Sequence, residues 1–288
     1  MGIDFIFILK AIIVAIVEGI TEFIPISSTG HMILVGNLID FTGEFADMFE
    51  VVIQLGAILA VVVLYWKKIY TTVIEFFKFL FGGKKEAKRG FDFWISVLIG
   101  TIPAIILGFA FHDTIKEKLF STQTVAIGFI VGGFLLILIE NNFRKNLKNK
   151  KNVTKDIDKI SFSQAIKVGI FQCLAMWPGM SRSASTIMGG WIAGLSTTVS
   201  AEFSFFLAIP AMVGASGLDL IKYEGYAQMT STQWIALVVG FIVAFLVALL
   251  VIEGFIAFLK KKPMRVFAIY RIFAGIILVV LMLIGIIK

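Results

Sequence analysis

Six long apolar stretches constrain the fold of this chain more than any other feature of its sequence. They cover residues 51–66, 93–111, 124–139, 201–221, 234–259 and 266–287. A helix needs about 20 apolar residues to cross the hydrocarbon core of a bilayer, and most of the stretches approach that length. The whole chain is 59% hydrophobic, whereas a soluble domain is about 45–50% apolar. The sequence therefore predicts a polytopic, all-α integral membrane protein.

Lysine and arginine concentrate in three segments that flank these stretches. Of the 26 Lys and Arg residues, 18 lie in the segments 67–89, 144–159 and 260–265. Positive charge beside membrane helices concentrates on the cytoplasmic side and can contact anionic lipid headgroups. We therefore interpret the three segments as cytoplasmic loops. The net charge of +7 then reflects membrane topology, and nucleic acid is not an expected partner.

A motif that is interrupted by a proline occurs twice. Its first copy, residues 18–31, reads EGITEFIPISSTGH, and its second copy, residues 172–186, reads QCLAMWPGMSRSAST. In each copy an apolar helical run breaks at the proline, Pro25 or Pro178, and a cluster of hydroxyl residues follows. Duplicated broken helices of this kind build ion and substrate sites in transporters and predict one composite site here.

The cytoplasmic assignment of the basic segments sets the direction of both copies. The first copy then enters the membrane from outside and the second from the cytoplasm. We expect a helical bundle with two inverted-topology repeats, each containing a re-entrant broken-helix hairpin. The single membrane domain, 1–288, would comprise a first repeat at about 1–140, a basic cytoplasmic linker at 141–160 and a second repeat at about 161–288. Irregular backbone at membrane depth is tolerated only inside protein or beside water, so we expect the two breaks to meet inside the bundle.

Two carboxylates lie in the first copy of the motif. Glu18 and Glu22 are four residues apart, so on a helix their side chains project from one face. Such a pair can bind a hard divalent cation, Mg²⁺ or Ca²⁺, or can divide into a general acid and a general base. Their neighbours are apolar, and ionisable residues inside a membrane are costly and usually functional. We therefore predict that both carboxylates belong to a functional site.

Hydroxyl residues follow each proline where a new helix should begin. They are Ser27, Ser28 and Thr29 in the first copy and Ser181 and Ser183 in the second. Helix N-termini present free N–H groups and a positive dipole end to anions. Aligning the two prolines places Ser28 opposite Ser181. We predict that these residues bind phosphate, with ordinary helix capping as the alternative.

The two copies also contribute a cation and a histidine. Arg182 could clamp phosphate through parallel hydrogen bonds, or could form a structural ion pair with Glu18 or Glu22. His31 could act as a general acid, base or nucleophile, or could be a hydrogen-bonded spectator. Carboxylates, hydroxyls and an arginine together suit the cleavage of a phosphate ester or anhydride, where catalysis is mostly positioning and charge neutralisation. In a membrane-embedded site the natural substrate is a lipid phosphate.

At these motifs the chain strongly resembles the bacterial undecaprenyl-pyrophosphate phosphatase family, also known as the bacitracin-resistance proteins. The matching stretches are residues 18–31, 49–61, 102–104, 111–116, 178–186 and 268–271. The resemblance implies hydrolysis of undecaprenyl diphosphate to undecaprenyl phosphate and inorganic phosphate. This reaction recycles the carrier lipid for peptidoglycan synthesis and confers bacitracin resistance. The resemblance also implies a divalent-cation requirement and a location in the bacterial plasma membrane, with an active site that opens to the outer face.

Individual roles follow from the same resemblance. It implies metal or acid–base roles for Glu18 and Glu22, and phosphate contact for Arg182. Ser28 and His31 become candidates for the nucleophile and its proton partner, with direct attack by a metal-bound water as the alternative. The expected partners are the lipid diphosphate, membrane lipids and, as one option, a second copy of the chain in a homodimer.

Two other functional classes fit part of the sequence. A secondary transporter or lipid flippase would share inverted repeats and a midplane anion site. The hydroxyl cluster together with His31 favours chemistry over transport. A structural scaffold is the third class, and the membrane-embedded Arg182 argues against it.

Overall fold

The computed structural model describes residues 2–119, 121–148, 152–285 and 287, with the side chains of 112–119 excepted. Its helices are α1 (Phe5–Thr21), α2 (Ser28–Leu38), α3 (Glu44–Leu64), α4 (Trp66–Gly82), α5 (Lys88–Leu119), α6 (Thr122–Lys148), α7 (Phe162–Gln172), α8 (Arg182–Ile192), α9 (Thr197–Lys222), α10 (Ser231–Leu259) and α11 (Arg265–Leu283). Within the described ranges, α3, α5, α6, α9, α10 and α11 are long and apolar enough to cross a membrane. The expected polytopic all-α membrane protein is confirmed.

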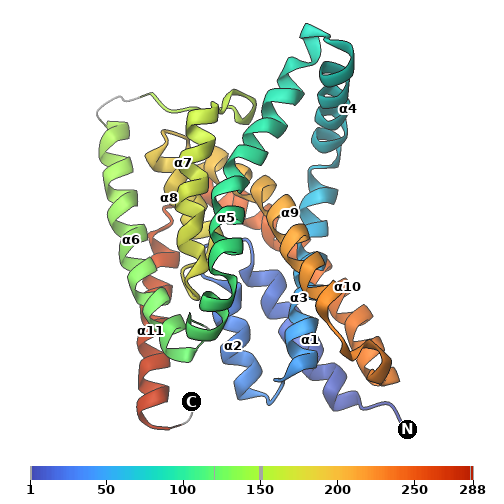
Figure 1. Ribbon diagram of the computed structural model, residues 1–288. Helices are drawn as coiled ribbons and strands as arrows, with labels where there is room; N and C mark the ends of the chain where they lie inside the picture. The colour runs from blue at the N-terminus through green and yellow to red at the C-terminus, as the bar shows by residue number, and fades with distance from the viewer. Residues whose placement is uncertain (1, 120, 149–151, 286, 288) are drawn as a thin grey trace.

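Two broken-helix hairpins, α1–α2 and α7–α8, pack among the long helices. The helices after the breaks, α2 and α8, have 11 residues each, so each is about 16 Å long and too short to cross a hydrocarbon core of about 30 Å. In Figure 1 the α1–α2 hairpin enters the bundle from the end at which the N-terminus lies. The α7–α8 hairpin enters from the other end, and the short 3₁₀ helix η3 (Cys173–Met176) continues α7 into its break.

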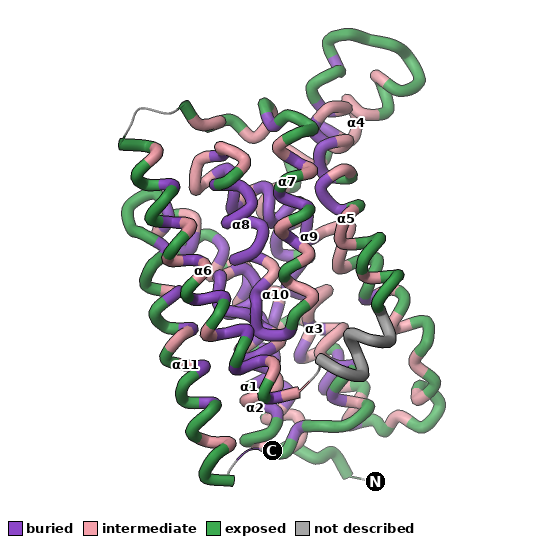
Figure 2. The backbone as a smooth tube through the Cα atoms, turned by 60° about the vertical axis from the view of Figure 1, so that its left-hand side comes forward, coloured by how far each residue is buried: buried purple, intermediate pink, exposed green. Residues whose placement is uncertain are grey.

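The hairpins are enclosed by long helices. Helix α10 packs against α1 and α3, α6 packs against α11, and α8 packs against α7 and α9. The main apolar cluster includes Phe23 from the first break, Ile187 from α8 and Ile252 from α10, all buried. Phe23 also meets Phe205 of α9 edge to face, with ring centroids 5.3 Å apart. Figure 2 shows the buried residues along the centre of the molecule and the exposed residues on its outside and ends. Most of the first break is buried, and so are residues 178–181 of the second break, whereas Leu174 and Trp177 just before them are exposed.

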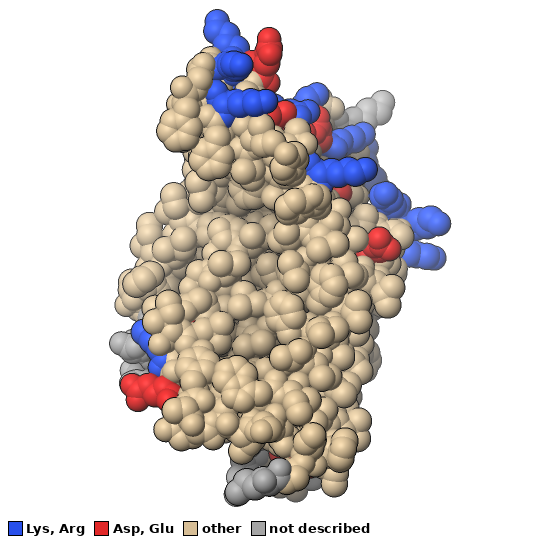
Figure 3. Space-filling model, turned by 90° about the vertical axis from the view of Figure 1, so that its right-hand side faces the viewer, with Lys and Arg blue, Asp and Glu red and all other residues tan. Residues whose placement is uncertain are grey.

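One of the expected loops is helical instead. Residues 67–89 form most of α4, the 3₁₀ helix η1 (Lys85–Ala87) and the start of α5, a hairpin that projects beyond the rest of the bundle (Figure 1). Helix α4 has an apolar face because large apolar residues recur along it at helical spacing. Its C-cap is Gly83, whose φ of 60° is the left-handed conformation that often ends a helix. Lysine and arginine gather at this end of the molecule, and the broad middle of the face in Figure 3 is uncharged.

The other two basic segments are closer to the loops that the sequence predicts. Segment 260–265 is the short turn between α10 and α11. Of the expected linker 141–160, residues 141–148 extend α6, residues 149–151 lie outside the described part of the chain, and η2 (Ile157–Lys159) follows.

Candidate active site

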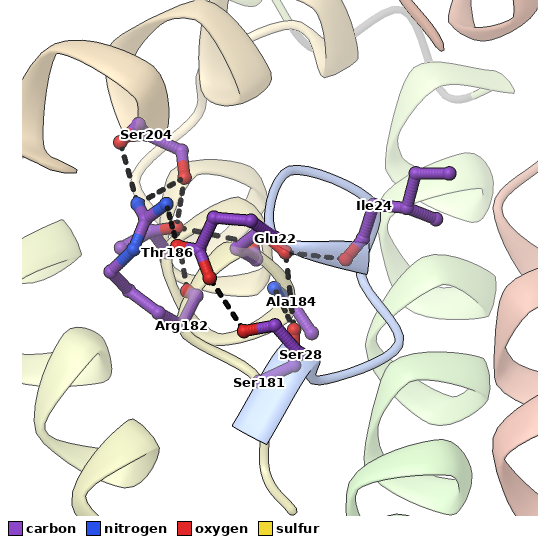
Figure 4. A network of polar contacts seen from close by, with 9 residues as sticks. Glu22, Ile24, Ser28, Ser181, Arg182, Ala184, Thr186 and Ser204 are labelled. Carbon is purple, nitrogen blue, oxygen red and sulfur yellow. Dashed lines mark hydrogen bonds and ion pairs between the residues drawn. The ribbon is translucent and has the colours of Figure 1, made fainter. Parts of the chain in front are cut away.

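The two breaks contact each other in the middle of the bundle. Ser183 Oγ, at the start of α8, donates a hydrogen bond to the carbonyl oxygen of Ile24 in the first break at 3.0 Å. Arg182 Nη2 lies 3.1 Å from Glu22 Oε1. Residues about 160 positions apart thus form one cluster, as Figure 4 shows.

Each short helix starts from a serine with unusual backbone geometry. Ser27 caps α2 with a φ of 74°, and Ser181 caps α8 with a φ of 69°. A non-glycine residue with a positive φ is uncommon, and the strained backbone costs about 1–3 kcal/mol of stability. Such residues persist only where the surrounding structure holds them, and they are found most often at functional sites. Ser181 Oγ recovers part of that cost because it accepts a hydrogen bond from the backbone N–H of Ala184 at 3.2 Å.

The shared cap geometry changes the correspondence between the two copies of the motif. Proline alignment places Ser28 opposite Ser181, but the structure matches Ser27 with Ser181 as helix caps. Ser28 and Arg182 are therefore the equivalent first residues of α2 and α8. The offset comes from one extra residue in the second break, where Gly179 adopts a φ of 87° and a Cβ would lie 2.4 Å from the carbonyl oxygen of Val125.

Glu22 is the centre of the cluster. Only 7% of its surface is exposed. Its Oε2 accepts a hydrogen bond from Ser28 Oγ at 2.5 Å, and its Oε1 pairs with Arg182. One carboxylate therefore holds the first residues of both short helices, a hydroxyl on one side and a guanidinium on the other.

Arg182 is oriented by helix α9. Its Nη1 donates to the carbonyl oxygen of Ser204 at 2.9 Å and to Ser204 Oγ at 3.3 Å. Thr186 Oγ1 donates to Ser204 Oγ at 2.7 Å. Within the described part of the chain, the buried Arg182 Nε has no hydrogen-bond partner. Ser204 was not predicted, since a lone serine in an apolar span has no distinctive spacing.

Glu18 lies one helical turn before Glu22 and has a different environment. It is fully buried, and neither of its carboxylate oxygens has a hydrogen-bond partner among the described residues. A buried carboxylate without a donor is costly, and a bound cation would offset that cost. No group of three or more His, Cys, Asp or Glu that could hold a metal occurs in the described ranges. Two carboxylates suit a cation whose other ligands are phosphate oxygens and water.

No hydrogen bond joins His31 to Ser28 in this structure. Its Nδ1 lies 2.7 Å from the carbonyl oxygen of Ser27, and its Nε2 lies 2.7 Å from the hydroxyl of Tyr270 in α11. The carbonyl oxygen can only accept, so Nδ1 carries the proton in the neutral ring and Nε2 accepts from Tyr270. Both nitrogens are therefore engaged away from the predicted nucleophile.

A cavity of about 160 Å³ opens between the two breaks. The residues that line it are Glu22, Ser27, Ser28, Thr29, Gln54, Ala175, Met176, Pro178, Gly179, Ser181, Arg182 and Met212. Six of these were predicted as site residues. Glu18, His31 and Ser183 are buried outside this lining. Gln54 was missed as a site residue, although it lies in one of the stretches that carry the family resemblance.

The chain is similar in sequence to known proteins over nearly its whole length. The family model described as "Bacitracin resistance protein BacA" matches residues 11–277. The chain belongs to this family. An undecaprenyl-diphosphatase of Clostridium perfringens is 67% identical, and the alignment covers 98% of each chain. Undecaprenyl-diphosphatase 2 of Clostridioides difficile is 66% identical over 98% of this chain and 97% of the relative. The BacA family match covers the second hairpin, the first hairpin from residue 11 onward, and every residue of the cluster around Glu22.

Proposed function

We propose that this protein hydrolyses undecaprenyl diphosphate to undecaprenyl phosphate and inorganic phosphate, and thereby recycles the carrier lipid for peptidoglycan synthesis. The supporting observation is the arrangement of Glu22 between Ser28 Oγ and the Arg182 guanidinium. All three residues line one cavity of a multi-pass membrane protein, which supports Ser28 as the nucleophile, Glu22 as the proton acceptor and Arg182 as the phosphate-binding cation. Relatives named as undecaprenyl-diphosphatases, similar over nearly the full chain, identify the lipid.

The first step of the proposed mechanism is attack by Ser28. The 2.5 Å hydrogen bond to Glu22 Oε2 directs the Ser28 proton toward a base. A bond forms between Ser28 Oγ and the terminal phosphorus as the bond from that phosphorus to the bridging oxygen breaks. Glu22 takes the proton, and undecaprenyl phosphate leaves.

The second step releases phosphate from Ser28. Water attacks the phosphorus of the phosphoserine, and the bond from that phosphorus to Ser28 Oγ breaks. The water oxygen and both of its protons leave on the inorganic phosphate as H₂PO₄⁻, and Glu22 returns to Ser28 Oγ the proton that it took in the first step. Arg182 stabilises the charge on the transferring phosphoryl group in both steps, and its bonds to Ser204 fix the guanidinium beforehand. The first residues of α2 and α8 line the same cavity, and free N–H groups at these helix starts would add to that stabilisation.

A divalent cation is part of the proposal. Glu18 and Glu22 would hold it, and when bound it would neutralise charge on the diphosphate. The unpartnered oxygens of Glu18 support this assignment. We further propose that the protein lies in the bacterial plasma membrane, with the basic end of the molecule (Figure 3) in the cytoplasm, and that its cavity opens to the outer face, as the family resemblance implies.

Phosphate release tests the proposed function. Purified protein in detergent should liberate inorganic phosphate from a long-chain prenyl diphosphate, EDTA should abolish the release, and added Mg²⁺ or Ca²⁺ should restore it. Ser28→Ala should abolish turnover under the same conditions. Lipid movement across vesicles without phosphate release would support transport instead and would overturn the proposal.

A further inference from the structure

Helix α11 contacts both hairpins through two consecutive residues, Tyr270 and Arg271. Adjacent side chains on a helix point in directions about 100° apart, so one residue can reach each hairpin. Arg271 is fully buried, which excludes a contact between its guanidinium and a lipid headgroup.

Tyr270 acts on the first hairpin through His31. The Tyr270 hydroxyl and the Ser27 carbonyl oxygen hold opposite nitrogens of the imidazole, each at 2.7 Å. The Tyr270 and His31 rings are also nearly parallel, with an interplanar angle of 8° and centroids 5.6 Å apart. The imidazole is thus held between α11 and the carbonyl of the left-handed residue that caps α2.

Arg271 acts on the second hairpin directly. Its Nη2 donates to the carbonyl oxygens of Gly179 at 3.0 Å and Met180 at 2.9 Å, and also to that of Gly128 in α6 at 3.0 Å. Gly179 and Met180 immediately precede Ser181, the left-handed residue that caps α8. Nothing larger than glycine fits beside this guanidinium at position 132, where a Cβ would lie 1.9 Å from Nη2.

We propose that Tyr270 and Arg271 are positioning residues for the phosphatase reaction and hold the two strained serine turns at the distance that the composite site requires. Ser28 and Arg182 follow these two turns directly, so a shift of either turn changes the distance between nucleophile and phosphate clamp. Positioning errors of about 1 Å can cost about a hundredfold in rate. The inference rests on the proposed phosphatase function.

Conservative variants test the inference, with kcat, KM and detergent melting temperature measured together. Tyr270→Phe removes only a hydroxyl, so kcat should fall roughly tenfold while KM and melting temperature change little. Tyr226→Phe is the matched control, because it also removes a hydrogen-bonded tyrosine hydroxyl, in this case one that donates to the Leu220 carbonyl oxygen at 2.8 Å. Its kcat should equal that of the wild type.

Arg271 provides a second, independent test. The three hydrogen bonds to Gly128, Gly179 and Met180 all come from one nitrogen of Arg271, Nη2, so a lysine ammonium can replace them. Arg271→Lys should therefore retain most of the kcat, whereas Arg271→Met, which has no donor, should lose at least tenfold. If Arg271→Met fails to fold, Arg271→Lys and Tyr270→Phe still test the positioning role.

The outcomes separate this inference from the proposed function. A wild-type protein that releases no phosphate contradicts the function itself. An active wild type with an unchanged kcat in Tyr270→Phe overturns the positioning role of Tyr270. Losses of kcat that follow the melting temperature in every variant would show general destabilisation and would overturn the inference.

Discussion

At the residue scale, one carboxylate organises the site. Glu22 accepts from Ser28 and pairs with Arg182, while Glu18 on the same helix has no partner among the described residues. Two chemically identical side chains therefore have different surroundings. In the proposed mechanism Glu18 and Glu22 share the cation, and Glu22 alone also accepts the Ser28 proton, so the two carboxylates can be distinguished by experiment.

The two carboxylates should respond differently to the same substitution. Glu22→Gln removes the base for Ser28, so turnover should fall about a hundredfold or more, and extra Mg²⁺ should not restore it. Glu18→Gln should raise the Mg²⁺ or Ca²⁺ concentration needed for half-maximal activity, and excess cation should restore part of the turnover. Titration of phosphate release against metal concentration checks both. Glu44→Gln, at an exposed position, is the control, and near-wild-type behaviour of both variants would contradict the site assignment.

Arg182 makes the ion pair that the sequence allowed and also lines the cavity in which we propose that phosphate binds. Its two terminal nitrogens bind different partners, Glu22 and Ser204, and a lysine cannot reproduce that fork. Arg182→Lys should therefore fold with a melting temperature near that of the wild type yet lose about a hundredfold in turnover. Arg265→Lys, on the exposed surface, should be neutral. A fully active Arg182→Lys beside an unstable Arg182→Ala would indicate a structural pair only.

At the element scale, the second break depends on how closely α6 approaches it. A Cβ at Gly128 would lie 2.2 Å from the carbonyl oxygen of Pro178 and 2.9 Å from the carbonyl carbon of Gly179. Backbones this close are typical of small residues at helix contacts in membranes. The position of the second hairpin is therefore set by a glycine on a different helix.

Alanine at Gly128 should displace that hairpin. We expect Gly128→Ala to destabilise the protein by about 1–3 kcal/mol, because the added methyl overpacks a backbone contact, and to lower kcat as well. Gly214→Ala is the matched control, because it lies inside α9 with nothing within 4 Å of its Cβ and should leave stability unchanged or slightly raised. Melting temperatures in detergent check both. Equal stability of the two variants would show that the close contact between α6 and the second break does not limit the stability of the protein.

At the scale of the whole molecule, the two hairpins enter from opposite ends and meet at the centre (Figure 1). Basic residues mark the end that carries α4 and the start of α5 (Figure 3). The apolar sides of the long helices are exposed, which suits contact with lipid. This arrangement is what two inverted repeats would produce, and the inversion itself remains a prediction about the membrane.

Labelling of cysteines from each side of intact cells tests that prediction. In a Cys173→Ser background, cysteines at Lys84, Lys155 and Lys262 should react only with a reagent that enters the cytoplasm, because positive charge stays inside. Cysteines at Glu44 and Ala227, at the other end of the bundle, should react with an impermeant reagent. If labelling placed residues 84 and 155 on opposite sides of the membrane, the inverted arrangement would be excluded.

The sequence by itself determined the class of the protein and the segments that form its site. Apolar transfer energy adds residue by residue along the chain, so six stretches were sufficient to predict membrane helices. The proline and serine motifs located both breaks for the same local reason, since proline and cap residues act on their own turn of helix. The helical form of residues 67–89 was missed, because charge content concealed the apolar face of α4.

Only the tertiary structure decided which atoms meet. Ser28 binds Glu22 rather than His31, Arg182 pairs with Glu22 and Ser204, and α11 reaches both breaks. A hydrogen bond requires two atoms to lie within about 3 Å in the right direction. That distance depends on the packing of helices that are far apart in the chain, and no local pattern of residues encodes it.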